Sequence, residues 1–425
     1  MDDATVARAA ALACADPEFR MFARGWTGTL TLKSGPRSWT LQITDGFVAG
    51  PRLDADSRNT STTSFDVVVS ASADGWEKLL SSPPPPMFTD FFGASFAGAC
   101  SVTPSIVDAR FHNALRRFSE LVRHAKNGSD PQAVVGEGRR QAGTHDAPVG
   151  RYIHLDLLGV DHRVYYEEAG QGVPLLCQHT AGSDGRQWRH LLEDERVTER
   201  FRVIAYDLPF HGKSLPPESV AWWAEEYRLT TDFAMAVPLA LGMALSLDRP
   251  VFIGSSIGGC LALDLACFHP HHFRASISLE GALKVVGRAS GDDSTQQLQI
   301  EDPGLHAAIM MMIMAPMAPE SCRHETRFHY AQGAPGVFVG DLHYYQTDHD
   351  LREELDRFDT EVCPVYLLTG EYDAPTVAST LDAGRLIKGA QVQIMEGLGH
   401  FPMSEDHHRL MHYLLPILDE ISLKV

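Results

Sequence analysis

The segment 251–268 constrains the fold more than any other part of the chain. A short apolar run leads into Gly254-Ser255-Ser256-Ile257-Gly258, and small and apolar residues at helical spacing follow. This order predicts a strand, a sharp turn and a helix. Such a turn holds one side chain, that of Ser256, in a strained and exposed position, while the glycines let strand and helix approach closely. Gly-x-Ser-x-Gly alone is a weak pattern, but its flanks favour Ser256 as a nucleophile.

Composition limits the partners and the compartment that we expect. The 425 residues are enough for two domains, and the net charge of −19 argues against nucleic acid and anionic membrane surfaces, which both require clustered Lys and Arg. The seven cysteines are scattered without a CxxC pair, so neither a disulfide framework nor a metal site is predicted, and no cofactor is expected. The acidic N-terminus is unlike a signal peptide, and no apolar run approaches the roughly 20 residues that span a bilayer. We therefore expect a cytoplasmic protein with a small-molecule substrate and no membrane insertion.

Residues 1–125 have the pattern of a small α+β domain. Two alternating runs joined by Ser34-Gly35-Pro36-Arg37 predict a β-hairpin, and a third strand is predicted over 65–70. Helices are predicted after it, the last of them over 106–126, where apolar residues recur at helical spacing. The polar, glycine-rich residues 126–150 then predict a linker. An extra domain of this kind favours self-association as a homo-oligomer and leaves the number of subunits open.

Four features stand out in this N-terminal region: the hairpin with Trp39, the pair Asp45-Gly46, the strand 65–70 running into Asp74-Gly75-Trp76, and the closing helix. In these features the region resembles the sterol carrier protein type two-like lipid-transfer domains. That family usually has a glycine-rich strand where this chain has the segment 94–102. The resemblance implies an apolar, lipid-binding cavity. The alternative is an accessory or oligomerisation domain whose core the aromatic residues fill.

From residue 151 the pattern changes to short apolar strands that alternate with helices. This alternation predicts an α/β fold, with a mainly parallel sheet and helices on both faces. We expect the sheet domain in two parts, 151–282 and 358–425. Between them, 283–357 is rich in Met, aromatic residues and Pro, and an insertion of this length predicts a cap over the site. After an opening hairpin at 152–166, strands are predicted over 173–178, 201–206, 251–253, 275–279, 364–368 and 391–395.

A loop suited to binding an oxyanion follows the predicted strand 173–178. A tetrahedral intermediate needs fixed N–H donors at the developing negative charge. The loop His179-Thr180-Ala181-Gly182-Ser183 can supply one from Ala181, and Ile257, the residue after the nucleophile, supplies the other. The imidazole of His179 is expected to hold the loop in shape, with a place in the substrate pocket as the alternative.

Asp373 and His400 complete the set of groups that an activated serine requires. Asp373 lies in a turn just beyond a predicted strand, where a carboxylate can orient an imidazole without taking its proton. Glu371, which is closer to the strand, and Asp382 are the competing carboxylates. His400 follows a strand and is preceded by glycines, which let the loop bend so that the ring reaches Ser256. The order Ser, Asp, His is that of the α/β-hydrolases.

Five segments carry a resemblance to that family: His179–Gly182, Asp207–Ser214, Gly254–Gly258, Gly370–Asp373 and Gly399–Pro402. In these segments, residues 151–425 resemble an α/β-hydrolase of the capped esterase and C–C hydrolase type. Thr180 stands where Gly is common in that family, which leaves the oxyanion donor open. The family also contains epoxide hydrolases and dehalogenases, which use Asp as nucleophile, whereas Ser256 implies an acyl-enzyme and a carbonyl substrate.

The predicted cap is expected to shape the substrate pocket. Met side chains suit the wall of an irregular apolar pocket, and polar aromatic residues can bind a substrate hydroxyl or carboxylate. The alternatives are that the Met residues pack the cap onto the body and that the polar stretch is a solvated or interface surface. The pocket candidates are His179, Trp222, Met310, Met314, His343 and Tyr344.

The sequence thus predicts a serine hydrolase that cleaves an ester or lactone of a small to medium apolar molecule. Ser256 attacks the carbonyl carbon, His400 takes the proton and later activates water, and Asp373 orients His400. The N–H groups of Ala181 and Ile257 hold the oxyanion. One alternative is hydrolysis of a carbon–carbon bond in a diketone-type ring-cleavage product. The other is a non-catalytic lipid carrier or receptor on a hydrolase scaffold.

Overall fold

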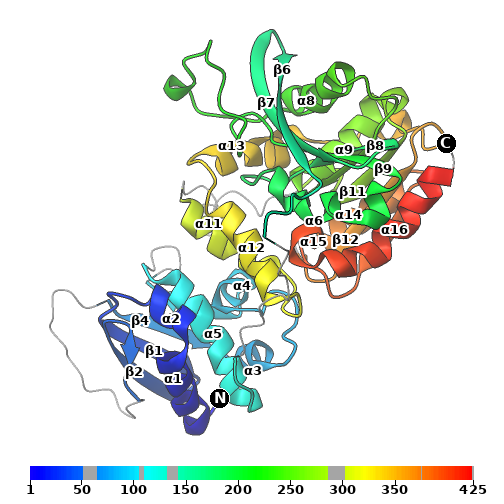
Figure 1. Cartoon of the computed structure of the whole chain (residues 1–425). Coiled ribbons are helices and arrows are strands. Elements are labelled where there is room, and N and C mark those ends of the chain that lie inside the picture. The colour runs from blue at the N-terminus through cyan, green and yellow to red at the C-terminus, as the bar shows by residue number, and fades with distance from the viewer. Residues whose placement is uncertain (51–64, 105–109, 132–141, 286–301, 375, 424–425) are drawn as a thin grey trace. The chain divides into compact units, whose positions relative to one another are not determined.

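The fold is described from a computed structural model of the whole chain (Figure 1). The description covers residues 1–50, 65–104, 110–131, 142–285, 302–374 and 376–423. The chain divides into two compact units. One consists of Met1–Val134 with Ala308–Met317, and the other of Val135–Ala307 with Ala318–Val425. Among the described residues, no helix is both long and apolar enough to cross a membrane.

The first unit is a five-stranded sheet with packed helices. Its strands lie in the order β3-β2-β1-β4-β5, and the β1–β4 pair is parallel whereas the other pairs are antiparallel. Burial alternates along β1 and β2, as expected for strands with one face toward a core. The strands are β1 (Gly28–Ser34), β2 (Arg37–Thr44), β3 (Phe47–Val48), β4 (Val67–Ala71) and β5 (Cys100–Thr103). The helices are α1 (Asp3–Ala15), α2 (Pro17–Phe22), α3 (Ala73–Leu80), α4 (Phe91–Phe96) and α5 (His112–Asn127).

Helix α5 starts and ends later than the sequence pattern predicts. The predicted start at Ile106 lies outside the described residues, and the backbone at Phe111 is not helical. The helix ends at Gly128, whose φ of 69° forms a left-handed cap, and the Gly128 N–H donates to His124 O. The first residues of the predicted linker therefore belong to the helix.

Aromatic side chains fill the described interior of the first unit. Trp26 stacks on Phe111 with ring centroids 5.2 Å apart, and the ring edge of Trp76 meets Phe91 at 5.9 Å. Large apolar side chains of this kind dominate core energetics. The lipid cavity implied by the sterol carrier resemblance stays a prediction. The largest fully buried apolar side chains are Phe19, Trp26, Trp39, Trp76, Phe91, Phe92 and Phe118.

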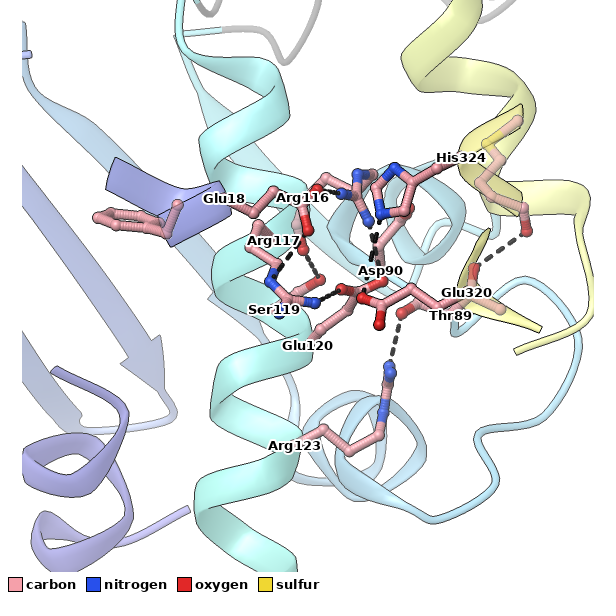
Figure 2. Close-up of polar contacts among 12 residues, drawn as sticks. Glu18, Thr89, Asp90, Arg116, Arg117, Ser119, Glu120, Arg123, Glu320 and His324 are labelled. Carbon is pink, nitrogen blue, oxygen red and sulfur yellow. Dashed lines mark hydrogen bonds and ion pairs between the residues drawn. The ribbon is translucent and has the colours of Figure 1, made fainter. Parts of the chain in front are cut away.

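A buried ionic network joins α5 to the chain around α2 (Figure 2). Arg116 lies 2.8 Å from Glu120 and also pairs with Glu18. Arg117 lies 2.7 Å from Asp16 and 2.8 Å from Glu120. Removing one partner of a buried ion pair leaves an uncompensated charge, so this network fixes the two segments against each other.

Residues 308–317 come from the predicted cap but belong to the first unit. They contain the end of α11 (Pro303–Met310) and the turn η4 (Met311–Ile313). Thr89 Oγ1 donates to Met312 O at 3.0 Å, and Thr89 O accepts from Arg123 at 2.6 Å (Figure 2). The Met side chains at 310, 311, 312 and 314 are all buried. The Met-rich part of the predicted cap is thus packed in the same unit as the N-terminal residues.

The second unit has an eight-stranded sheet in the order β13-β12-β11-β10-β8-β9-β7-β6. The strands from β13 to β9 in this order are parallel, and β7 and β6 add an antiparallel edge. The central strands β10 and β11 are buried along their whole length, as strands covered on both faces are. The α/β fold with a mainly parallel sheet is therefore confirmed. The strands are β6 (Val149–Leu157), β7 (Val160–Ala169), β8 (Val173–Gln178), β9 (Phe201–Tyr206), β10 (Val251–Ser255), β11 (Ala275–Leu279), β12 (Val365–Gly370) and β13 (Gln391–Met395).

Helices pack against this sheet. On α9, the carbonyl oxygens of Ala262 and Gly259 accept hydrogen bonds from Ser276 and Ser278 of β11, at 2.6 and 2.8 Å. On α16, Leu410, Met411 and Leu414 join the core cluster that the strands form. The longer helices are α8 (Thr231–Ala244), α9 (Ile257–Phe268), α12 (Glu320–Tyr330), α13 (Val337–His343), α14 (Val377–Leu386) and α16 (His407–Leu423). The short ones are η1 (Gly185–Trp188), α6 (Arg189–Leu192), α7 (Glu195–Thr198), η2 (Trp222–Ala224), η3 (Pro270–His272), the π-helical turn η5 (Tyr344–Asp348), η6 (Leu355–Arg357) and α15 (Pro402–Glu405).

The carboxyl ends of the parallel strands meet at one edge of the sheet, where ligands bind in open α/β folds. The loop 179–183 follows β8, Ser256 follows β10, and Glu280 follows β11. Asp373 and His400 follow β12 and β13. The fold thus brings chain segments that are far apart in the sequence to one place.

Candidate active site

Ser256 lies in a strained turn between β10 and α9. Its φ and ψ are 58° and −114°, a backbone conformation that side chains rarely adopt, and its N–H donates to Leu279 O at 2.9 Å. A Cβ on Gly254 would lie 2.3 Å from Gly258 O, and one on Gly258 would lie 2.8 Å from Gln178 O. Both glycines are therefore required by close backbone approach. The side chain of Ser256 is only 6% exposed, so this site is covered rather than open.

Asp373 and His400 form a buried pair. His400 Nδ1 lies 2.8 Å from Asp373 Oδ2, which also accepts a hydrogen bond from Thr376 Oγ1. Burial alone would raise the pKa of Asp373, but the nearby His400 and the hydrogen bonds to the carboxylate outweigh it and lower the pKa below its ordinary value. Asp373 therefore stays ionised beside the imidazole.

The competing carboxylates have other partners. Glu371 accepts a hydrogen bond from Gly397 N at 2.9 Å and is exposed. Asp382 pairs with Arg385 at 2.7 Å on α14. Of the three carboxylates considered from the sequence, Asp373 alone lies against His400.

The buried side chain of Glu405 holds the loop that carries His400. It accepts hydrogen bonds from the backbone N–H groups of Gly399 and Phe401, on either side of the histidine. Ser255 Oγ also donates to His400 O at 3.3 Å. These contacts position the imidazole, and sequence reasoning did not identify Glu405, which has no motif position.

The oxyanion candidates are both buried. In the loop after β8, Thr180 N donates to Gln187 and Gly182 N donates to Asp341, at 3.0 and 2.8 Å. The hydrogen bonds of the described residues leave the Ala181 N–H without an acceptor. Ile257 is the first residue of α9, where an N–H has no partner within the helix. The two N–H groups that the sequence proposes for the oxyanion thus have no acceptor among the described residues.

His179 has a structural environment. Its Nδ1 donates to Thr180 O at 2.8 Å, and its Nε2 accepts from Leu208 N at 3.1 Å. Burial, together with the nearby His211, lowers the pKa of His179 to about 4, so the ring is neutral. Both ring nitrogens are used by the backbone, which favours the loop-holding role over a place in the substrate pocket.

Asp341 on α13 anchors the same loop from the other side. Its Oδ2 accepts hydrogen bonds from Gly182 N and from His211 Nε2, both at 2.8 Å, and its Oδ1 accepts from Tyr227 at 3.1 Å. The other nitrogen of His211 donates to Pro209 O at 2.9 Å. Burial alone would lower the pKa of His211, but Asp341 raises it above its ordinary value. The result is a buried ion pair directly behind the oxyanion loop.

Tyr345 is the residue of η5 that reaches Ser256. Its hydroxyl lies close enough to Ser256 to act on it, and burial, together with the nearby Cys260 and Asp373, raises the pKa of the phenol well above its ordinary value. The hydrogen bonds of the described residues include none between Ser256 and His400, and such bonds often tighten only when substrate binds. The phenol therefore stays protonated and in contact with the candidate nucleophile.

Three of the predicted pocket residues, Trp222, His343 and Tyr344, have contacts that do not include Ser256. Trp222 and His343 line a cleft of about 770 Å³ whose walls do not include Ser256. Tyr344 donates instead to Asp264 at 2.5 Å. Met310 and Met314 lie in the segment grouped with the first unit, so their place in the pocket stays a prediction. Within the described residues of the second unit, no three side chains of the metal-binding types lie close enough together to hold an ion.

Comparison with known proteins identifies the family. The family model for the alpha/beta hydrolase family matches residues 175–412, which is more than half of the chain. The chain is 27% identical over 237 residues to a pimeloyl-[acyl-carrier protein] methyl ester esterase of Neisseria meningitidis, covering 50% of this chain and 82% of that relative. It is 31% identical over 123 residues to a protein of Mycobacterium phage D29 provisionally named a non-heme haloperoxidase, and spans 40% of its length.

Solved structures share the fold. A thermophilic esterase from Thermogutta terrifontis aligns with a TM-score of 0.54 at 19% identity, over 64% of this chain and 99% of the esterase. At this identity the likeness concerns the fold alone. The aligned part of the chain is about as long as the second unit. Together with the strand order and the matched residues, it leads to one conclusion: this chain belongs to the alpha/beta hydrolase family.

Proposed function

We propose that this protein is a serine hydrolase that cleaves an ester or lactone of a small to medium apolar molecule through an acyl-enzyme. The observation that carries the proposal is the strained turn at Ser256 together with the Asp373–His400 pair, 2.8 Å apart, at the same edge of the sheet. A hydroxyl is a weak nucleophile until an adjacent base takes its proton, and this arrangement provides such a base.

The proposed mechanism assigns one role to each of these groups. Ser256 Oγ attacks the carbonyl carbon while His400 Nε2 takes the hydroxyl proton. The carbonyl oxygen becomes an oxyanion between the N–H groups of Ala181 and Ile257. His400 then gives the proton to the leaving oxygen, and the same imidazole activates the water that releases the acid. Asp373 keeps its negative charge throughout and stabilises the imidazolium.

The choice of a carbonyl substrate rests on the nucleophile. A serine forms an acyl-enzyme, whereas the aspartate of epoxide hydrolases forms an alkyl ester. The match to a methyl ester esterase supports an ester as the first choice. Because Ser256 is buried, we favour a substrate of limited size that fits the covered site and loses its contact with water when it binds.

A substrate panel tests this proposal on the full chain. It contains 4-nitrophenyl and alkyl esters of increasing chain length, lactones, a thioester, and a yellow dienoate diketone. We expect hydrolysis of esters or lactones by the wild type and its loss in Ser256→Ala. Cleavage of the dienoate alone would instead support carbon–carbon bond hydrolysis. Turnover that Ser256→Ala leaves unchanged would contradict the serine mechanism.

A further inference from the structure

The carboxyl group of Glu280 is buried beside Asp373, and the mechanism above gives it no role. Glu280 directly follows β11, with a φ of 56°, and its N–H donates to Leu368 O at 2.9 Å. Its two carboxyl oxygens accept hydrogen bonds from Thr369 Oγ1 and Gly370 N, each at 2.8 Å. Glu280 and Asp373 are both 0% exposed, so solvent does not separate them.

The contact between the two carboxyl groups requires a proton. The two buried groups act on each other, and two carboxylates would leave no donor between them because both offer only acceptors. Asp373 Oδ2 already faces His400 and Thr376. Asp373 Oδ1 is buried and receives no N–H or hydroxyl donor from the rest of the described residues. Oδ1 is therefore the oxygen of Asp373 that is left without a donor.

Charge decides which residue holds the proton. Asp373 faces the imidazole of His400, whereas Glu280 faces only a neutral hydroxyl and a backbone N–H. Burial and the nearby negative charge of Asp373 raise the pKa of Glu280 well above its ordinary value. Two like charges that are buried side by side without solvent between them do not both ionise, so the group without a cationic partner is the neutral one.

We infer that Glu280 is a protonated positioning residue whose carboxyl O–H donates a hydrogen bond to Asp373 Oδ1. The pair then carries a single negative charge, and both oxygens of Asp373 have donors. This fixes the plane of the Asp373 carboxylate so that Oδ2 faces His400. The inference rests on the proposed function for its effect on catalysis, whereas the protonation is a property of the resting protein.

Infrared spectroscopy tests the protonation without any turnover. The difference spectrum between wild type and Glu280→Gln, recorded near neutral pH, is expected to show the loss of a protonated carboxyl C=O band. A difference confined to carboxylate bands would overturn the inference. This result does not depend on Ser256 being a nucleophile, so it separates failure of the inference from failure of the proposed function.

The pH profile of kcat/KM tests the effect on His400. Gln keeps an N–H donor for Asp373 Oδ1, so Glu280→Gln is expected to retain most of the activity with the acid limb of the profile unchanged. If Glu280 were ionised, its replacement would remove a nearby negative charge and lower the pKa of His400. The acid limb would then move to lower pH by about one unit or more, which would contradict the inference.

Glu280→Leu is the matched variant without a donor. We expect kcat to fall about 10²-fold with little change in KM, because the carboxylate that orients His400 is no longer fixed. The melting temperature of each variant shows whether it folds. Equal activity of folded Glu280→Leu and Glu280→Gln would overturn the positioning role. If no variant or wild type is active or reacts with a serine-directed probe, the proposed function fails and the infrared result still decides the protonation of Glu280.

Discussion

Tyr345 lies near Ser256, and it is not among the site residues that the sequence predicts. Tyr344 and Tyr345 are adjacent in the chain, so helical periodicity alone does not predict which of the two side chains faces the sheet. In the π-helical turn η5, Tyr344 is bound to Asp264 and Tyr345 faces Ser256. Turns of this kind are frequent at functional sites.

Tyr345→Phe is therefore expected to lower kcat/KM about tenfold, which is the worth of one hydrogen bond of about 1.4 kcal/mol in the transition state. Tyr344→Phe is the matched control, since it removes a hydroxyl of the same turn that does not touch Ser256. It should lower the melting temperature and leave kcat/KM near that of the wild type. Steady-state kinetics on a 4-nitrophenyl ester measure both. Full activity of Tyr345→Phe would show that its contact with Ser256 has no catalytic effect.

The residues with the strongest sequence signals are those whose role depends on local geometry. Ser256 is marked by its glycines, and Asp373 and His400 by strand ends and turns. Glu280, Asp341 and Tyr345 have no such mark, because each acts on a residue that is distant in the chain. Their positions follow from the strand order and from the path of the segment before β12, and neither can be derived from local pattern.

Among the elements, the end of the turn η5 is attached to α9 by another buried histidine–aspartate pair. His349 Nδ1 lies 3.0 Å from Asp264, and its Nε2 donates to Ala282 O at 2.7 Å. Burial alone would lower the pKa of His349, but the nearby Cys260 and Asp264 raise it well above its ordinary value. Both nitrogens donate, so the ring is an imidazolium.

This pair predicts a loss of stability at alkaline pH. A histidine whose pKa is raised by folding stabilises the protein fully below its unfolded pKa, about 6.5, and less as the pH rises through its folded pKa. The melting temperature of the wild type should therefore fall as the pH rises above neutral. His349→Gln should lower the melting temperature at pH 6 and flatten this dependence, whereas the exposed His271→Gln should change neither. An unchanged slope in His349→Gln would contradict the assignment.

Asp341 of helix α13 holds the loop 179–183 in place through its buried contacts with Gly182 and His211. Asp341→Asn removes the charge that His211 and the Gly182 N–H share, and breaking a buried pair costs about 3–5 kcal/mol. We expect a lower free energy of unfolding in urea, together with a reduced kcat, because the loop that holds Ala181 loses its anchor. Asp350→Asn, which breaks an exposed pair with Arg352, is the control and should cost less than about 1 kcal/mol. Similar stability of both variants would disprove the anchoring role.

Strand positions agree closely with the sequence pattern, and helix ends agree less well. The apolar runs 173–178, 201–206 and 275–279 are β8, β9 and β11 without any change of bounds. Helix α8 begins at Thr231 because the Thr230 side chain caps its first turn. Caps depend on single side chains and backbone angles, which apolar periodicity does not report.

At the scale of the whole molecule, the two compact units do not simply follow one another along the chain. The segment 308–317 belongs to the first unit, although the residues before and after it belong to the second. The sequence pattern could not show this, because a run of Met side chains suits a pocket wall and a packing surface equally well. The hydrogen bond between Thr89 and Met312, which are far apart in the chain, is what favours a packing surface over a pocket wall.

A shortened chain that starts near Gly150 is therefore expected to be less stable and less soluble than the full chain. It lacks the N-terminal residues that belong to the same unit as 308–317, where Met310, Met311, Met312 and Met314 are buried, and each fully buried side chain of this type contributes about 1.5–3 kcal/mol. We expect a lower melting temperature, dye binding to exposed apolar surface, and aggregation. Replacing the four Met residues by Gln in the shortened chain should reduce the dye binding. A shortened chain as stable and soluble as the full one would contradict the shared packing.

The central claim is that Ser256 forms the acyl-enzyme. The most direct measurement is mass spectrometry of the full chain after treatment with a fluorophosphonate probe, followed by mapping of the modified peptide. The account predicts one adduct, on Ser256, that is absent in Ser256→Ala and slow to form in His400→Ala. An enzyme that hydrolyses esters or lactones but carries no adduct on Ser256 would contradict it.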